Sequence, residues 1–354
     1  MTVGEIELMK ARTSEKALAT HPKDLMSLQP DALREGFKQV TALVTGGFGF
    51  VGFNLCLDLQ ARGYNIVTVD NRLTESPLKV SWSKDWQHYH RSILNSTLED
   101  CIKDVDVVFH LAVVSLPETF ERPDYSLEVA THGTFRVLEA VHKAGAFFVY
   151  VSSSEVYGDG SVPMAETQNF RPTTLYGAGK AAGELITESY AKMNHLRDRY
   201  LIIRPTNCYG PHAREDKHAT IITKLLRSMI FNQEMTVYGD GKQTRDFMHV
   251  SDTVDGIITA YENREKLALH PTVNLCTGKE TSLNKLIELC WDAVKAEDRE
   301  PMGQIVYAEQ PRKGDVRRMW LDPWYTHRVL GWKSKIALKE GLRDYVKWLV
   351  EKHE

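Results

Sequence analysis

The stretch Val40-Thr41-Ala42-Leu43-Val44-Thr45-Gly46-Gly47-Phe48-Gly49-Phe50-Val51-Gly52 joins a short apolar run to a glycine-rich turn. The first six residues favour a buried strand, and a helix-like pattern then runs from 51 to 62. Glycines at this junction let the backbone turn tightly and approach a pyrophosphate at the helix N-terminus. The spacing GxxGxxG differs from the commoner GxGxxG, and glycines alone also fit an ordinary connection between a strand and a helix.

Further apolar runs occupy residues 66–70, 105–111, 147–151 and 200–204, with helical patterns at 133–144 and 176–193. Short apolar strands alternating with helices predict a parallel sheet covered on both faces. We therefore predict an α/β fold, a Rossmann-type doubly wound parallel sheet, over residues 40–205. Residues 1–39 form an N-terminal extension, and residues 206–354 form a smaller mixed α/β region, part of which returns to the sheet.

The composition is that of an ordinary globular protein. The chain has 354 residues, 42% of them apolar and 26% charged, and a formal net charge of -3. Such a charge argues against proteins that grip nucleic acid through its phosphates and against polybasic membrane-surface proteins. No apolar run reaches the roughly 18–20 residues that span a bilayer, and the first forty residues resemble no secretion signal. We expect a cytoplasmic protein without membrane or nucleic-acid partners.

The five cysteines are scattered and form no CxxC pair, so we expect free thiols and no metal site.

The second apolar run ends in Asp70, 18 residues after Gly52. A carboxylate at this strand end accepts hydrogen bonds from adenosine ribose hydroxyls and repels a 2′-phosphate. Asp70 therefore favours NAD over NADP as the cofactor, although Arg72, two residues further on, could weaken this preference.

Two later motifs carry candidate chemistry. Ser153 follows the fourth apolar run, where strand ends open onto a ligand crevice. Tyr176 and Lys180 are spaced i and i+4, which places them on one helix face. A nearby ammonium lowers the pKa of a phenol, so Tyr176 could act as a general base toward a sugar hydroxyl. Taken singly, a serine-rich turn and a surface Tyr–Lys pair explain the same residues.

In this order and in these strand contexts, the motifs resemble the extended short-chain dehydrogenase/reductase family, in its NAD-dependent nucleotide-sugar epimerase/dehydratase branch. The resemblance runs from about Val40 to the C-terminus. Further matching stretches are His110-Leu111-Ala112, Gly133-Thr134, Arg204-Pro205-Thr206-Asn207, Tyr209-Gly210-Pro211, Gly239-Asp240-Gly241, Arg245-Asp246 and Arg312 with Gly314-Asp315.

The resemblance implies that residues 40–205 bind NAD and that residues 206–354 bind a nucleotide-diphosphate sugar. In the family pattern Tyr176 removes the proton from a sugar hydroxyl, usually at C4, while a hydride passes to the nicotinamide. Lys180 holds the nicotinamide ribose, and Ser153 donates a hydrogen bond to the developing carbonyl oxygen. Positions matching cofactor contacts are Gly46, Phe48, Gly49, Phe50, Gly52, Asp70, Asn71, Arg72, Ser92, Ile93, Leu111, Ala112, Val113 and Lys180.

Positions matching substrate contacts are Thr119, Ser154, Asn207, Arg245 and Arg312. Two arginines suit bidentate recognition of a diphosphate. Family members commonly form homodimers through helices that correspond here to 133–144 and 176–193. Two positions depart from the family pattern: Ala130 stands where Asn is usual, and Ser92-Ile93 stands where Asp-Ile or Asp-Leu is frequent. These departures concern cofactor contacts and leave the predicted fold unchanged.

The residues after Ser153 bear on the reaction. A 4-epimerase oxidises C4, lets the 4-keto sugar rotate and returns the hydride. A 4,6-dehydratase also needs a base at C5 and an acid at C6, and Asp-Glu often supplies them; here Ser154-Glu155 stands there. Ser-Glu is similar to some dehydratases and to UDP-glucuronate decarboxylases, but Arg312-Lys313-Gly314-Asp315 lacks the Arg-x-Pro-Asp element of the decarboxylases.

We therefore favour NAD-dependent C4 epimerisation through a transient 4-keto intermediate. The alternative is 4,6-dehydration with Glu155 as the base, and UDP-glucuronate decarboxylation is less favoured. A non-catalytic, NAD-sensing relative would be expected to lack the tyrosine or the lysine, and this chain keeps both.

Overall fold

The computed structural model describes residues 39–71, 83–310 and 314–353. Residues Val40–Glu354 form one compact unit. Arg72 and Arg312, and all of the predicted N-terminal extension except Gln39, lie outside the described residues. The predicted boundary at residue 205 stays a prediction.

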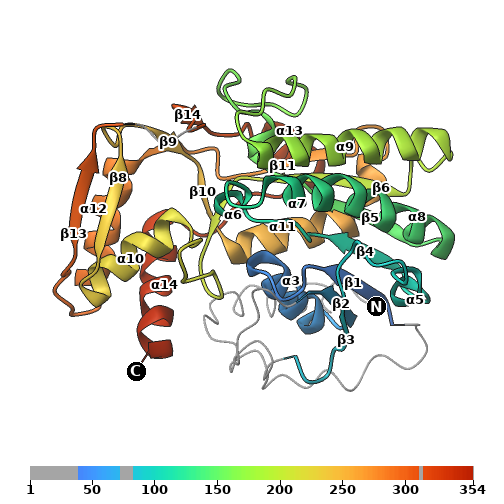
Figure 1. Cartoon of the computed structure of the whole chain (residues 1–354), viewed down its shortest axis with the longest axis horizontal. Helices are drawn as coiled ribbons and strands as arrows, with labels where there is room; N and C mark the ends of the chain where they lie inside the picture. Colours follow the sequence, from blue (N-terminus) through green and yellow to red (C-terminus); the bar gives the residue numbers. More distant parts are fainter. Residues whose placement is uncertain (1–38, 72–82, 311–313, 354) are drawn as a thin grey trace, which may run out of the picture. The chain divides into compact units, whose positions relative to one another are not determined.

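In the described residues, seven parallel strands form the main sheet (Figure 1). Their order is β11 (Thr272–Leu275), β6 (Tyr200–Pro205), β5 (Phe147–Val151), β4 (Val107–His110), β1 (Thr41–Thr45), β2 (Asn65–Asp70) and β3 (Gln87–His90). The strand order reverses between β1 and β4, where both β2 and β4 pair with β1 in parallel. The predicted doubly wound α/β fold is confirmed.

Each central strand buries side chains on both faces of the sheet. Ala42 and Val44 of β1 pack in a core with α3 (Phe50–Ala61) and α11 (Val250–Glu262). Leu43, which points to the other face, packs in a core with α8 (Thr134–Ala144), and α9 (Leu175–Met193) lies on the same side (Figure 1). A strand covered on both faces needs a continuous apolar run, which explains why these strands were legible in the sequence.

Two strands of the sheet lie outside the apolar runs identified in the sequence, although a return of part of residues 206–354 to the sheet was predicted. The strand β3 reads Gln-His-Tyr-His and lies at the sheet edge, where its side chains are only partly buried. A polar edge strand carries neither an apolar run nor a clean alternation. The strand β11 comes from the second half of the chain and pairs with β6.

Part of the second half forms another apolar core around α10 (Ile221–Phe231), α12 (Leu283–Lys295) and α14 (Leu338–His353). Small sheets accompany it: β8 (Glu234–Tyr238) with β13 (Gln304–Ala308), β7 (Asn207–Tyr209) with β10 (Phe247–His249), and β9 (Thr244–Arg245) with β12 (Thr281–Ser282) and β14 (Arg318–Met319). The remaining helices are α5 (Glu99–Ile102), α6 (Leu116–Thr119), α7 (Pro123–Glu128) and α13 (Trp324–Leu330), with single turns at Val129–Gly133, Ser154–Val156 and Arg264–Leu267.

The five cysteines are free, as expected. Within the described ranges, every helix is too short or too polar to cross a membrane.

His110 ends β4 and is only 1% exposed. Its Nδ1 lies 2.7 Å from Thr45 Oγ1, and its Nε2 lies 3.1 Å from Thr134 Oγ1. Burial, together with the charge of Lys180, lowers the pKa of His110 from 6.5 to about 3. His110 therefore holds β1, β4 and α8 together as a neutral side chain.

We predict that the free energy of unfolding falls as the pH drops from about 6.5 toward 3. In that window the unfolded chain takes up a proton that folded His110 does not, so stability is lost by up to about 1.4 kcal/mol per pH unit. A His110→Gln variant should lack this part of the slope in chemical denaturation at several pH values. A variant with the slope of the unchanged protein would contradict the assignment.

Candidate functional site

A cavity of about 570 Å³ opens at the carboxyl ends of the main sheet. Residues that end or follow β1, β2, β4, β5 and β6 line one side of it, and residues around β9 and Gly314–Val316 line another. Of the predicted site residues, the following line the cavity: Gly46, Gly49, Phe50, Gly52, Asp70, Asn71, Ser92, Ile93, Leu111, Ala112, Val113, Ser153, Ser154, Glu155, Tyr176, Lys180, Asn207 and Arg245.

The glycine turn brings the backbone close to itself and to the cavity. Gly46 has a φ of +72°, and its oxygen accepts a hydrogen bond from the N–H of Gly49 at 2.9 Å. A Cβ atom on Gly52 would lie 2.1 Å from the same oxygen. The helix α3 begins directly after the turn, so its free N–H groups face the cavity.

Asp70 lies at the end of β2 beside the turn. Its Oδ2 accepts a hydrogen bond from the N–H of Phe48 at 2.9 Å. Asp70 therefore holds the turn and lines the cavity at once. Phe48 was predicted as a cofactor contact, but its side chain is 1% exposed and packs beneath the turn, near Phe53 and His88.

Ser153, Tyr176 and Lys180 meet at the cavity. Thr174 caps α9 by accepting a hydrogen bond from the N–H of Gly177 at 3.1 Å, which starts the helix at the required place. Ser153 hydrogen-bonds the phenol of Tyr176. The Lys180 ammonium is buried and donates to the carbonyl oxygen of Val151 at 2.7 Å.

The sequence predicted that Lys180 lowers the pKa of Tyr176, but the surroundings of Tyr176 raise this pKa. Burial raises the pKa of Tyr176, the charge of Glu155 raises it further, and the hydrogen bond with Ser153 opposes both. Burial also lowers the pKa of Lys180 to about 7, and the charge of Glu184 opposes that effect. The expectation described the effect of an ammonium on a phenol in water, whereas burial desolvates both Tyr176 and Lys180.

The second half of the chain supplies polar groups on the other side of the cavity. Arg245 forms an ion pair with Asp315 and donates to the carbonyl oxygen of Val316 at 2.7 Å. The Asn207 side chain donates to the carbonyl oxygen of Asp246 at 3.3 Å. The predicted pair of arginines is described only at Arg245.

Thr119 was predicted as a substrate contact, but it is 2% exposed and does not line the cavity. Its hydroxyl lies 2.9 Å from the hydroxyl of Ser126 and donates to the carbonyl oxygen of Ser115. Thr119 therefore joins α6 to α7.

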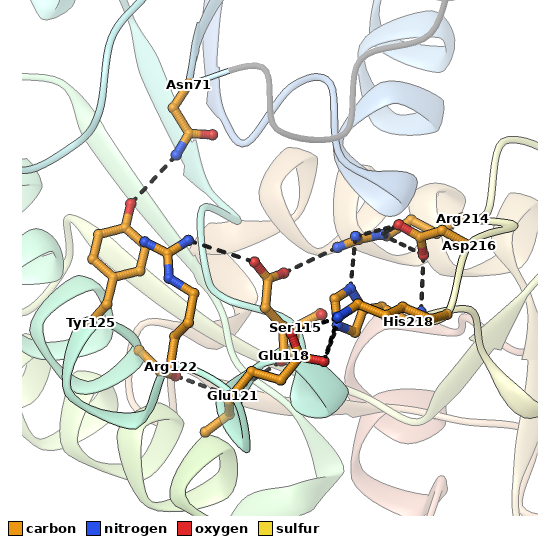
Figure 2. Close-up of polar contacts among 12 residues, drawn as sticks. Asn71, Ser115, Glu118, Glu121, Arg122, Tyr125, Arg214, Asp216 and His218 are labelled. Atoms are coloured by element: carbon orange, nitrogen blue, oxygen red, sulfur yellow. Dashed lines mark hydrogen bonds and ion pairs between the residues drawn. The ribbon is translucent and has the colours of Figure 1, made fainter.

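Figure 2 shows a charged wall of the cavity that the motifs did not reveal. Arg214 Nη1 lies 3.1 Å from a carboxylate oxygen of Glu118, and Arg214 Nη2 lies 2.6 Å from Asp216. Arg122 Nη1 lies 3.9 Å from the same Glu118. Glu118 and Arg214 both line the cavity, yet they are 96 residues apart.

The same wall continues with Glu121, whose carboxylate lies 3.1 Å from His218 Nε2 (Figure 2). The same carboxylate lies 2.8 Å from Lys217 Nζ. Glu118 and Glu121 belong to the segment around α6. Their basic partners in the second half of the chain, Arg214, Lys217 and His218, belong to the loop 211–220. These ion pairs hold the loop against the main-sheet half at the cavity.

The sequence model of the NAD dependent epimerase/dehydratase family matches residues 42–276. The chain belongs to this family. The resemblance inferred from its motifs is confirmed, and the chain is an NAD-dependent enzyme.

Relatives within the epimerase/dehydratase family carry different activities. The chain is similar to UDP-glucose 4-epimerase of Mycolicibacterium smegmatis, with 31% identity over 88% of this chain and 99% of the relative. It is also 31% identical to UDP-glucuronic acid decarboxylase 4 of Arabidopsis thaliana, over 88% of this chain and 68% of the relative. The solved structure of UDP-glucose 4-epimerase with UDP-glucose from Thermotoga maritima has a TM-score of 0.80, 29% identity, and coverage of 89% of this chain and 100% of that one.

The residues at the turn fit the NAD of the epimerase/dehydratase family. A Cβ atom on Gly46, Gly49 or Gly52 would come within 3.0 Å of neighbouring backbone atoms, so only glycine allows this tight turn, whose backbone lines the cavity where a pyrophosphate can approach it. Asp70 places a carboxylate at the cavity beside the turn, where a ribose can be hydrogen-bonded.

We predict that Gly52→Ala lowers the affinity for NAD by at least about tenfold. The new methyl group would clash with the Gly46 oxygen, and displacing the turn costs on the order of 1–3 kcal/mol. Calorimetric titration with NAD measures the effect. Gly331→Ala is the control, because it adds a methyl group to a glycine outside the turn, where no atom lies within 4 Å of the added Cβ. Equal losses in both variants would contradict a local role for Gly52.

Proposed function

We propose that the protein is a UDP-sugar 4-epimerase that acts through a transient 4-keto sugar. The observation that carries the proposal is the meeting of Ser153, Tyr176 and Lys180 at the cavity, with Ser154 beside them. Ser154 is small, uncharged and 2% exposed, at the place where dehydratases often carry an acid. With NAD, Ser153, Tyr176 and Lys180 can support oxidation and reduction at C4 of the sugar. Position 154 provides no carboxylic acid of the kind that dehydratases often carry there.

Each member of the set has a separate task. Tyr176 takes the proton of the C4 hydroxyl and gives it back after the sugar has rotated. Ser153 donates a hydrogen bond to the same oxygen while it is a carbonyl. A positive charge on Lys180 offsets the cost of a buried phenolate. NAD, when bound, accepts the C4 hydride and returns it.

The cations on the substrate side support a neutral sugar over a uronic acid. Arg214 is paired with Glu118 and Asp216, and Arg245 is paired with Asp315. A substrate carboxylate that bound Arg214 would have to displace Glu118 or Asp216 and leave it without its partner, which costs free energy. Decarboxylation of a uronic acid is therefore the less favoured reaction.

One observation favours a second candidate, 4,6-dehydration. Glu155 lines the cavity, and its charge raises the pKa of Tyr176, so its carboxylate lies near the phenol. A carboxylate there could remove the proton at C5. We retain dehydration as the alternative.

The experiment is incubation of the protein and NAD with UDP-glucose or UDP-glucuronic acid in heavy water, followed by mass spectrometry and NMR. Epimerisation predicts a product of UDP-glucose with unchanged mass, inverted C4 and no carbon-bound deuterium. Loss of water identifies a dehydratase, and loss of carbon dioxide from the uronic acid identifies a decarboxylase. Either result contradicts the proposal.

Two variants accompany this experiment. Tyr176→Phe should lower kcat by about 10²–10⁴-fold while NAD still binds, because it removes only the general base. Glu155→Gln should abolish a dehydratase but reduce an epimerase only slightly. Normal turnover by Tyr176→Phe would show that the base is misassigned.

We also infer a homodimer through α8 and α9, in keeping with the sequence prediction. Apolar side chains on these helices are exposed: Phe135 by 37%, Leu185 by 51% and Met193 by 78%. Burying them against a second copy would remove apolar surface from water. As the sequence analysis predicted, we also propose that the protein is cytoplasmic.

We predict that Leu185→Glu turns the dimer into a monomer in analytical ultracentrifugation, because a carboxylate would be desolvated in the interface. The control is Leu269→Glu, which changes a leucine that is 89% exposed and lies outside both helices. A monomeric unchanged protein, or a dimeric Leu185→Glu variant, would contradict this interface.

A further inference from the structure

Glu184 is a buried carboxylate to which the proposed chemistry gives no task. It lies one turn beyond Lys180 on α9, and none of its surface is exposed. A carboxylate without solvent is costly unless hydrogen bonds and opposite charge surround it. Its partners show what it holds together.

Glu184 binds groups from two strands of the main sheet. It accepts a hydrogen bond from the hydroxyl of Ser152, at the end of β5. Arg204 on β6 donates to it through an Nε–H shared between both carboxylate oxygens at 3.0 and 3.1 Å, and through Nη2 at 2.6 Å. Arg204 in turn donates to the hydroxyl of Tyr157 at 2.7 Å and to the carbonyl oxygen of Glu166 at 3.0 Å.

The hydrogen bond with Ser152 fixes the chain on both sides of that residue. Val151, directly before it, provides the carbonyl oxygen to which Lys180 donates. Ser153, directly after it, hydrogen-bonds Tyr176. Glu184 therefore locks the end of β5 to the same helix that carries Tyr176 and Lys180.

Glu184 also acts on the charge of Lys180. Burial lowers the pKa of Lys180, the charge of Glu184 partly opposes this effect, and the net result is a pKa of about 7. The other groups around Lys180 do not supply a negative charge of this kind: His110 of β4 is held neutral, and the Tyr150 ring of β5 lies 5.1 Å from Nζ. Glu155 acts on Tyr176, and Arg204 brings a positive charge on the far side of Glu184.

We propose that Glu184 is a positioning residue, which clamps the end of β5 against α9 and places a buried negative charge one helical turn from Lys180. The inference rests on the proposed roles of Ser153, Tyr176 and Lys180. It explains why a buried ion pair between α9 and β6 lies directly behind these side chains.

The test compares Glu184→Gln with Glu188→Gln in the full chain. Glu188 lies one turn further along α9 and is exposed, so it receives the same chemical change without the clamp. We expect Glu184→Gln to lower kcat at neutral pH by about 10- to 100-fold, with KM for UDP-glucose nearly unchanged. The pH at which kcat falls as Lys180 loses its proton should move down by at least about 1 pH unit. Glu188→Gln should keep the kcat and the pH profile of the unchanged protein.

NAD affinity gives a second readout. Lys180 is expected to hold the nicotinamide ribose as an ammonium, so calorimetric NAD affinity should fall with rising pH. In Glu184→Gln this fall should begin at lower pH. If the unchanged protein turns over no UDP-sugar, the proposed function fails, and the pH dependence of NAD affinity alone decides the role of Glu184.

Glu184→Gln leaves Arg204 buried without its partner and could fold poorly. The double variant Glu184→Gln/Arg204→Met removes both charges and avoids this penalty. We expect it to be more stable than the single variant in chemical denaturation, yet still low in kcat and shifted in pH profile. Recovery of the original kcat and pH profile in the double variant, an unshifted profile in a folded Glu184→Gln, or an equal shift in Glu188→Gln would overturn the proposal.

Discussion

Parallel pairing positions the site, because every strand of the main sheet ends at the same edge. The strand β1 pairs with β2 on one side and β4 on the other, and the chain order reverses there. Helices must leave in opposite directions at this point, which opens a crevice beyond the strand ends. The glycine turn, Asp70 and Ser153 enter the cavity for this reason and not because they are close in sequence.

The chemistry of the crevice depends on buried polar groups, and burying these groups costs solvation free energy. Lys180, Glu184 and Arg204 are all buried on α9 and β6, behind Tyr176 and Ser153. Burial alone would neutralise the lysine and favour the protonated tyrosine, as the directions of their pKa shifts show. The charges of Glu184 and Arg204 stabilise one another and set the balance around Lys180. The formal net charge of -3 gives no indication of these buried groups of opposite charge, Lys180, Glu184 and Arg204.

The sequence predicted what local patterns encode. Gly46, Gly49 and Gly52 mark a turn because any Cβ would clash there, and apolar runs mark strands because both faces are covered. The polar edge strand β3 carries no such signal. The pairs Glu118–Arg214 and Arg245–Asp315 join residues far apart in the chain, and so no spacing rule could reveal them. The pKa of Tyr176 was misjudged for the same reason, since its burial and its neighbour Glu155 depend on tertiary packing.

The central claim is that the site oxidises C4 of the sugar, with Tyr176 taking the hydroxyl proton and NAD supplying the hydride acceptor, and then returns the same hydrogen to the same carbon. The direct measurement uses UDP-glucose that carries deuterium at C4, with the protein and NAD in ordinary water. The account predicts a C4 epimer that keeps its deuterium at C4, because a hydride carried on a carbon of the cofactor would not exchange with water. An epimer that has exchanged this deuterium for solvent hydrogen would contradict the account, as would the absence of an epimer.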